Sequence, residues 1–490
     1  MKHQKILRLL LFSILMGTNL FAVTNKTFFM PRPIGQDAVL QHAMVNYWVH
    51  HTDSPGGFTI NNTVFYQEST NSSDLARYFF PNNKTELAIG GEAITAAGTA
   101  IDISATWLGI EDGVGNLNAN FNSKIKIKPK EKKFGFILQY HKKLSAITNR
   151  LLLSINLPFV QAETNSNFSE YDKQGEFIKA HPLDVPPSSP FYNVTDAIGG
   201  QDYFYGKIKN STQKLARLAD INLKLNYNLI QKASKTLGIF SHITIPTSEK
   251  PKAVYLFEPM VGNAQHFGWG AGINATLEII EKNNHKLNIV GNLDYNYLFK
   301  STEKRTLDLT PNGPWSRFLS VTYQGFLNVI TPGINFFTQD LNVTPKSSIN
   351  GLAAFNYAYN SFQLEAGYNL WWKEKEKVTL KHAWNEKIGI ASLDPAAPAN
   401  TTFSTATIAR HVTENGSGDA VPTFIKQEDL NISSATHPSS CSHKVYLTLG
   451  LSGKWNDNPL CLNAGSSYEF ASSNKTLEYW AIWLQGIISV

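Results

Sequence analysis

The feature that most constrains this chain is a series of long segments in which apolar and polar residues alternate one by one. Between residues 217 and 229, for example, Ala219, Ile221, Leu223 and Leu225 are separated by mostly polar residues. Successive side chains of a β-strand point to opposite faces, so this period of two predicts strands with one apolar and one wetted face. The segments are about 10–13 residues long, whereas strands of soluble sheets most often have roughly 5–6 residues and about 9–11 cross a bilayer at a tilt. Their length therefore predicts strands that cross a membrane.

We expect about 14 such strands, within a range of 12–16. They are predicted at 84–92, 99–110, 117–128, 133–143, 148–159, 215–229, 235–247, 266–280, 285–300, 348–360, 361–373, 442–455, 460–472 and 477–490. One further alternating segment, Phe58 to Tyr66, does not fit the parity of this series. It belongs either to an N-terminal element or to the seam at which the sheet closes.

The connections between these strands fall into two classes of length. Short ones are expected near 111–116, 143–148, 230–235, 281–285, 360–361 and 456–459, and long ones at 160–214, 247–265, 301–347 and 374–441. When strands are counted alternately, the two classes lie at opposite ends, as in outer-membrane barrels with short periplasmic turns and long outside loops. Within the third long loop, the stretch 305–317 is expected to be either an ordered surface loop or an inward constriction.

The lack of long apolar runs decides how the strands must be arranged. After the N-terminus no stretch approaches 18 consecutive apolar residues, which excludes a helical membrane protein. Lipid offers no partner for backbone N–H and C=O groups, so the strands must close on themselves. Aromatic residues such as Tyr295, Trp371 and Tyr479 also stand at predicted strand ends, where interfacial girdles lie. The predicted fold is all-β: a transmembrane antiparallel β-barrel in the bacterial outer membrane, surrounded by its lipid.

The N-terminal residues divide into two parts. Residues 1–22 have a basic start, an apolar run and a small residue, Ala22, at the end, which predicts a cleaved signal peptide; an uncleaved anchor is the alternative. Residues 23–83 then form an N-terminal segment, and 84–490 the barrel. Within that segment, 36–50 is expected to be a short helix that plugs the lumen or an additional strand.

Charge and cysteine content exclude several classes of function. The net charge is +6, of which three come from Lys2, Lys5 and Arg8 of the signal, so the mature chain keeps about +3. That is too little to indicate nucleic acid as a partner. Cys441 and Cys461 are either bridged or free, and no spacing indicates a metal site, a cofactor or a catalytic motif. We therefore do not expect an enzyme.

The inward face of the barrel is where function is expected. Charged residues on a polar strand face would stay hydrated in a water-filled lumen, whereas burial in a dry core would cost several kcal/mol each, and rings of charge set selectivity in pores. The lumen-facing candidates are Lys124, Lys126, Arg150, Asp220, Lys224, Glu278, Asp294 and Glu365.

The chain resembles Gram-negative outer-membrane porins and transporters. The resemblance rests on the export signal, the tandem hairpins and a last strand that alternates from Trp480 to the final residue, although Val490 replaces the usual terminal aromatic. In strand number it is similar to the long-chain fatty-acid and aromatic-hydrocarbon transporters. The segment Ile243 to Thr247 also resembles their strand ends, with Ser248 where that pattern has glycine. The resemblance implies a class and the barrel-assembly machinery as a partner, and it assigns no functional residue.

Two functions of different kinds follow from this reading. The first is a channel or transporter through which small solutes pass passively along a polar lumen. The second is a surface adhesin or antigen in which the barrel only displays the outside loops 160–214 and 374–441. A barrel-embedded hydrolase and a soluble secreted β-protein are the remaining alternatives.

Overall fold

The structure is a computed structural model of the 490-residue chain. It describes residues 22–52, 57–91, 101–108, 121–174, 194–199, 203–324, 326–390, 413–414, 420–421 and 423–490. Most of the predicted signal peptide and the predicted turn at 111–116 lie outside these residues, as do parts of the loops 160–214 and 374–441.

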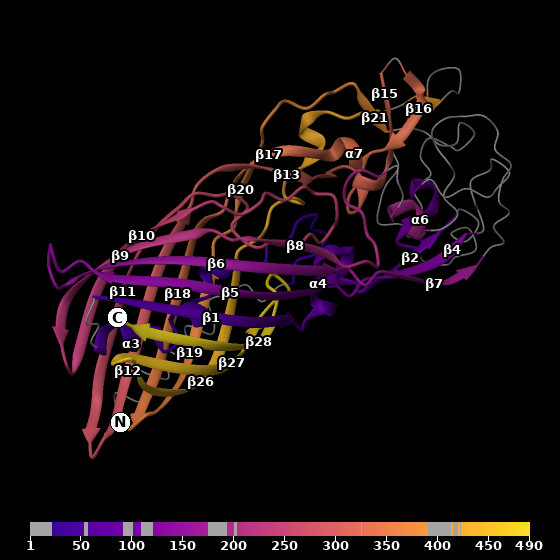
Figure 1. The fold of residues 1–490 in the computed structure, drawn as a ribbon. Coiled ribbons are helices and arrows are strands. Elements are labelled where there is room, and N and C mark those ends of the chain that lie inside the picture. Colours follow the sequence, from indigo (N-terminus) through magenta and orange to yellow (C-terminus); the bar gives the residue numbers. More distant parts are fainter. Residues whose placement is uncertain are drawn as a thin grey trace, which may run out of the picture.

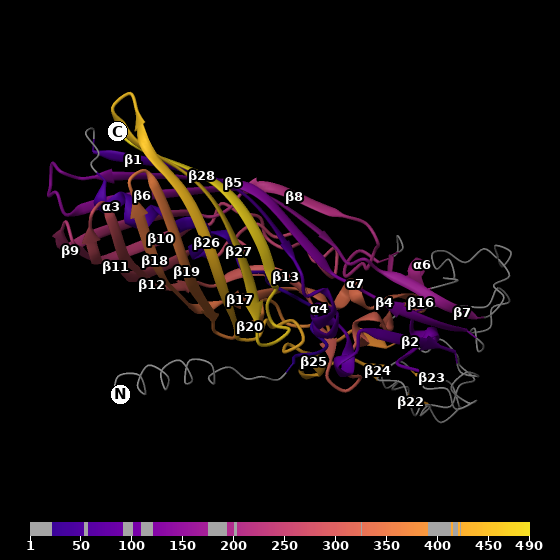
Figure 2. The ribbon, with the colours of Figure 1, turned by 90° about the horizontal axis from the view of Figure 1, so that it is seen from below.

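A closed antiparallel barrel of 12 strands forms the main body (Figures 1 and 2). One wall strand is interrupted, and its two parts, β8 and β9, both pair with β6. In order around the barrel the wall consists of β1 (Phe58–Ser69), β5 (Lys130–Lys143), β6 (Leu151–Asn165), β8 (Gln213–Leu218) with β9 (Ile221–Lys232), β10 (Lys235–Ile245), β11 (Gly268–Lys282), β12 (His285–Leu298), β18 (Lys346–Tyr359), β19 (Phe362–Lys373), β26 (Ser440–Trp455), β27 (Asn458–Ala471) and β28 (Tyr479–Ser489).

The predicted count of about 14 strands is corrected at the N-terminal side. The segment Phe58–Ser69, which did not fit the parity, is the closing strand: Val64 lies opposite both Leu484 of β28 and Phe136 of β5. The barrel therefore begins at Phe58 and not at residue 84. The predicted strands 84–92, 99–110 and 117–128 are absent from the wall, because the described parts of these segments pair with one another and with β7 in a separate sheet.

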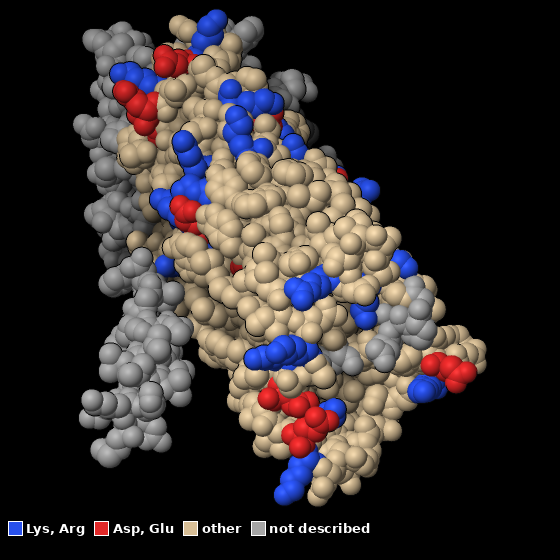
Figure 3. Space-filling view, turned by 90° about the vertical axis from the view of Figure 1, so that its left-hand side faces the viewer, with Lys and Arg blue, Asp and Glu red and all other residues tan. Residues whose placement is uncertain are grey.

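The wall separates an apolar outer face from a polar inner face, as the alternation predicts. The outward side chains are exposed and mostly aliphatic or aromatic, and Figure 3 shows a broad area without charges between two charged ends. Examples are Val64, Phe136, Leu225, Ile239, Ile273, Leu293, Phe355, Leu449, Ile482 and Leu484. The inward side chains are mostly amides and hydroxyls, and they are buried; examples are Asn61, Thr63, Asn226, Thr236, Asn274, Thr276, Asn356, Asn369, Thr448 and Asn463. An apolar outer surface of this kind is stable only in contact with lipid.

Two aromatic residues assigned to the interfacial girdle face inward instead. Trp371 is 2% exposed, and its indole Nε1 donates a hydrogen bond to Gln36 Oε1 at 2.9 Å. Tyr479 is also 2% exposed, and its hydroxyl donates to Glu131. Both positions lie on the polar face of their strands, where the indole N–H and the phenol O–H find partners.

The strand connections lie at opposite ends according to length. Tight turns such as Asn283-Asn284 and Asn456-Asp457 place both residues at positive φ, which matches the twist of a two-residue hairpin and which asparagine tolerates. At the other end the long connections build an ordered structure that we call the outer lobe (Figure 1). Among the described residues, no helix is both long and apolar enough to span a membrane.

The outer lobe consists of small sheets and short helices. Its strands are β2 (Glu86–Gly90), β3 (Ile103–Ser104), β4 (Asn122–Lys126) and β7 (Ser169–Gln174) in one sheet, β13 (Ser301–Thr306), β17 (Thr338–Thr344) and β20 (Lys377–Leu380) in a second, β15 (Ser320–Tyr323), β16 (Phe326–Pro332), β21 (Ile388–Ile390) and β24 (Thr423–Phe424) in a third, and the pairs β14 (Asp308–Leu309) with β25 (Leu430–Asn431) and β22 (Thr413–Glu414) with β23 (Ala420–Val421). Its helices are α4 (Ser72–Phe79), α6 (Val194–Gly199) and α7 (Ile334–Phe337), with the 3-10 turns Pro81–Asn83, Ala105–Leu108, Ser316–Phe318 and Gln427–Asp429. One buried apolar cluster, which includes Phe79, Leu87, Ile125, Trp315 and Phe337, joins these parts.

The stretch 305–317 lies inside this lobe, so it is neither a surface loop nor a constriction. Arg305 is fully buried and donates to Glu376 at 2.6 Å, while Glu303 lies 3.0 Å from the same guanidinium. Arg317 pairs with Asp308 at 2.9 Å, also without exposure to solvent. Buried charges need partners of this kind, because an uncompensated charge costs several kcal/mol.

Glu376 is expected to make the lobe sensitive to acid. Burial alone would raise the pKa of this carboxyl, but the charges of Arg305 and Lys373 hold the pKa below its ordinary value of 4.5. A carboxyl whose pKa is lower in the folded state than in the unfolded state stabilises the fold at pH values above its unfolded-state pKa. This stabilisation is lost as the pH falls from the unfolded-state pKa toward the folded-state pKa. Resistance of the lobe to limited proteolysis should therefore decline below about pH 4.5, and Glu376→Gln should weaken the lobe at neutral pH by about 3–5 kcal/mol and flatten this pH dependence.

Glu374→Gln is the matched control for that experiment. Glu374 pairs with Lys346 at 2.8 Å, but 38% of its side chain is exposed, and exposed ion pairs contribute little. Equal protease sensitivity of the two variants at pH 7 would contradict a stabilising role for the buried pair.

Candidate functional site

Residues 31–52, which we call the plug, run through the inside of the barrel. They include the 3-10 turn Ile34–Gln36 and the helices α2 (Ala38–His42) and α3 (Val45–His51). The apolar side of α2 packs on inward residues of the wall, among them Phe65 and Trp483, and α3 lies at the end where the tight turns are (Figure 1). The segment is thus helical rather than an additional strand, and it fills the lumen.

Local sequence explains why the plug is broken into two short helices. The Asp37 carboxylate accepts hydrogen bonds from the backbone N–H groups of Val39 and Leu40, which caps the start of α2. Met44 has a φ of 60°, which no helix interior accommodates, so α2 ends before it and α3 starts after it. The Met44 N–H then donates to the Glu365 carboxylate on β19 at 3.0 Å. The turn therefore binds the wall where the helical hydrogen bonds stop.

A cluster of four buried charges anchors the plug to one side of the wall. Lys444 of β26 lies 2.5 Å from Asp37 and 3.0 Å from Glu469 of β27, and Arg32 lies 3.2 Å from Glu469. None of the four side chains is more than 5% exposed. Two cations thus balance two anions, which is the condition under which buried charges are tolerated.

Neutral hydrogen bonds extend this anchor along the same side. Gln36 accepts from Trp371 of β19 through its side chain and from Asn350 of β18 through its backbone oxygen, at 2.9 and 2.7 Å. Arg32 also donates to Asn369 at 2.8 Å. At the opposite end of the plug, Trp48 donates to Ser489 at 3.0 Å.

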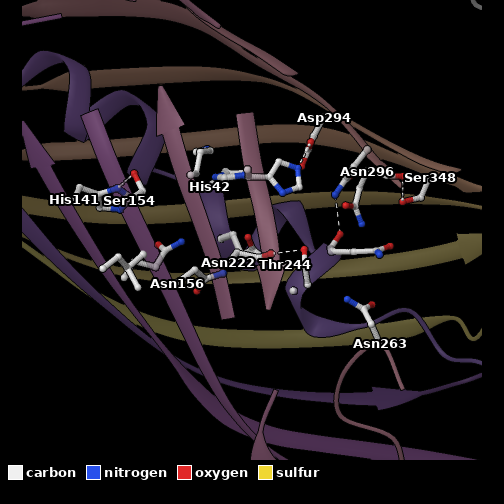
Figure 4. A pocket seen from close by; sticks show the side chains of 18 residues that line it. His42, His141, Ser154, Asn156, Asn222, Thr244, Asn263, Asp294, Asn296 and Ser348 are labelled. Carbon is white, nitrogen blue, oxygen red and sulfur yellow. Dashed lines mark hydrogen bonds and ion pairs between the residues drawn. The ribbon is translucent and has the colours of Figure 1, made fainter. Parts of the chain in front are cut away.

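The other side of the plug faces a small polar cavity of about 60 Å³ (Figure 4). His42 of α2 lies there, facing wall residues of β5, β6, β9, β10, β12 and β18. His242 forms a 2.8 Å contact with Asp294, and His141 forms one of 2.8 Å with Ser154. The plug is thus bound by charge on one side and leaves space on the other.

The predicted lumen residues are distributed over different environments. Lys124 and Lys126 are not in the lumen: they lie on β4 in the outer lobe and pair with Asp172 and Glu86. The prediction is wrong for these two because β4 alternates against the core of the lobe rather than across a barrel wall. Arg150 is an exposed residue of the turn between β5 and β6.

The remaining candidates lie on or beside wall strands. Asp220 is buried at the break between β8 and β9. Its carboxylate accepts hydrogen bonds from the Ser248 hydroxyl and the Asn263 backbone N–H, both in the connection between β10 and β11. Lys224 and Asp294 line the cavity, Glu365 binds Met44, and Glu278 is half-buried on β11.

The four anchoring charges were not predicted from the sequence: Arg32, Asp37, Lys444 and Glu469. Part of the signal was present, because Lys444 and Glu469 are opposite charges that face each other across two neighbouring strands. The plug residues were not recognisable, since Asp37 meets Lys444 across 407 residues of sequence.

The structure answers the cysteine question and tests for metal ligands. Cys441 and Cys461 are both free and buried. Within the described ranges, no group of three or more His, Cys, Asp or Glu side chains is placed to hold a metal ion.

A closed wall, an apolar belt and turns sorted by length define the class: this chain is an outer-membrane β-barrel. No family model matches it, and no curated protein does. Among solved structures it is similar to an outer membrane channel from Pseudomonas putida F1 (11% identity, TM-score 0.34, 89% of this chain and 97% of that chain). It is also similar to a FadL homologue from Pseudomonas aeruginosa (8%, 0.31, 96% and 98%) and the toluene transporter TodX from Pseudomonas putida (9%, 0.32, 96% and 95%). At such identities and scores, these structures assign no solute to this chain.

Proposed function

We propose that this protein is an outer-membrane channel for small solutes, and that the plug keeps this channel closed at rest. The observation that carries the proposal is that the plug occupies a polar lumen without being part of the wall. The wall closes through its own strand pairs, from β1 to β28, so it does not need the plug for closure. The plug is held mainly by side-chain contacts, which are able to break and re-form without unfolding the wall.

The polar lining favours hydrophilic solutes, since amides and hydroxyls dominate the inward face. A toluene transporter is one of the proteins with a similar structure, so the test includes a hydrophobic solute as well.

Flux through the purified chain in proteoliposomes tests the proposal. We expect slow uptake of small polar solutes above the rate of protein-free vesicles, measured with glycerol, a pentose and toluene. Uptake at the protein-free rate for all three, both by the full chain and by a variant without the plug, would contradict a channel function.

Adhesion is a second candidate, because the outer lobe is an ordered unit with its own buried core. Replacing the connection 381–425 with a short linker should abolish attachment to surfaces if the lobe is an adhesin, while leaving solute flux unchanged. Unchanged attachment would argue against this function.

A further inference from the structure

The cavity beside the plug is lined mostly by residues with polar side chains. It is formed by Gly35, Gln36, Gln41 and His42 of the plug and by wall residues of six strands, together with Asn263. Apart from Gly35 and Ile155, every residue that lines it carries a polar or charged side chain. An apolar solute would leave the amide, imidazole and hydroxyl groups of this lining without hydrogen-bond partners, which makes its binding unfavourable.

The charged groups around the cavity already have partners on the wall. The Asp294 carboxylate contacts His242 at 2.8 Å, and the Lys224 ammonium lies 4.4 Å from the centre of the Phe240 ring. Lys224 and Asp294 also carry opposite charges, so together they add no net charge to the lining. The cavity therefore does not favour an anion or a cation.

Several neutral polar atoms, in contrast, have no partner among the described residues. Asn156 is only 6% exposed, and neither its amide nitrogen nor its amide oxygen has a hydrogen-bond partner among the described residues. The same holds for His141 Nε2, Asn263 Oδ1 and Asn296 Oδ1. A buried polar group without a partner is energetically unfavourable, so this set of donors and acceptors is complementary to a ligand that offers both.

The volume limits the size of that ligand. A water molecule needs roughly 10–15 Å³ of such volume, so the cavity of about 60 Å³ corresponds to about four to six waters. That is the size of a short polyol or of urea.

We propose that this cavity binds a small, neutral, hydroxyl- or amide-bearing solute between the plug and the wall. The inference deepens the proposed function, on which it rests, by naming the solute class: the ligand would contact Gln41 and His42 of the plug and Asn156 of β6 together. Solute binding and plug position are then coupled, because the site is complete only when both surfaces are present.

Binding to the detergent-solubilised full chain tests this proposal without any flux measurement. Glycerol and urea are titrated by saturation-transfer NMR, with acetate and toluene as charged and apolar comparisons. We expect saturable signals for glycerol or urea and none for acetate or toluene. Asn156→Leu, which keeps the number and branching of the side-chain heavy atoms but replaces both unpaired amide atoms with methyl groups, should weaken binding at least tenfold.

Asn292→Leu is the matched control. Asn292 of β12 also faces inward with both amide atoms buried and unpaired, but it does not line the cavity. Its replacement should change the affinity less than twofold, and heat-modifiable gel mobility shows whether both variants remain folded.

Three results would overturn the proposal. The first is no saturable binding of glycerol or urea, which would leave water as the occupant, and the second is saturable binding of acetate or toluene instead. The third is an equal loss of affinity in the Asn156→Leu and Asn292→Leu variants. Failure of the proposed channel is a separate result. In that case the full chain would bind glycerol while neither it nor a plug-free variant allows glycerol to cross a vesicle.

Discussion

Removal of residues 23–52 is expected to turn the closed barrel into an open pore with at least a tenfold higher rate of solute uptake. The plug occupies the lumen, whereas the wall is joined all the way round by backbone hydrogen bonds between strands. The inward amides and hydroxyls would become hydrated rather than collapse on one another, since water replaces the partners that the plug supplied. Liposome swelling and single-channel recording measure the change.

A shorter truncation separates the plug from its outer attachment. Residues 23–30 lie in the outer lobe, where the backbone N–H groups of Asn25 and Thr27 donate to Phe80 and Ser434. Their removal alone should leave uptake within about twofold of the full chain. An unchanged rate after removal of 23–52, in a protein that still shows barrel mobility on gels, would refute the idea that the plug closes the channel.

The second large effect is expected from Lys444→Met. This change leaves Asp37 and Glu469 with Arg32 as the only cation in the cluster, so one buried negative charge lacks a partner. Breaking a buried ion pair in this way costs about 3–5 kcal/mol. The cost falls on the contact between plug and wall, so uptake should rise toward the rate of the plug-free variant while the wall stays folded.

A double variant makes this test specific. Lys444→Met with Glu469→Gln removes one charge of each sign and leaves Arg32 and Asp37 as a balanced pair, so it should leak less than the single variant. Lys286→Ala is the control, because Lys286 pairs with Glu281 on the exposed turn side and its loss should have little effect. A double variant that leaks as much as or more than Lys444→Met would rule out charge balance as the cause.

The strands of the wall from Lys130 onward were predictable because their pattern is local. Each strand faces lipid on one side and polar groups on the other, so apolar and polar residues alternate along its sequence. The error at 84–128 has the same origin: β4 buries Ile125 in the core of the lobe and presents Lys124 and Lys126 on its other side, so it has the same alternation without touching lipid.

The candidate site was less predictable than the wall. Lys224 and Asp294 were recognisable as charges on a polar strand face, and they do line the cavity. The plug was ambiguous because α2 has 5 residues and α3 has 7, which is too short for a helical period to emerge. Contacts such as Arg32 with Glu469 join residues 437 positions apart, and no local pattern specifies them.

The path of the plug also restricts how the molecule assembles. Val23 bonds to Asn474 in the connection between β27 and β28, whereas Phe58 bonds to Val490 at the far end of the wall. The plug therefore spans the length of the cylinder between these two ends, and β1 pairs with β28 where the barrel closes. If the ring formed first, residues 23–30 would have to be threaded through it, so the geometry favours a cylinder that wraps around its own N-terminal segment before the seam is sealed.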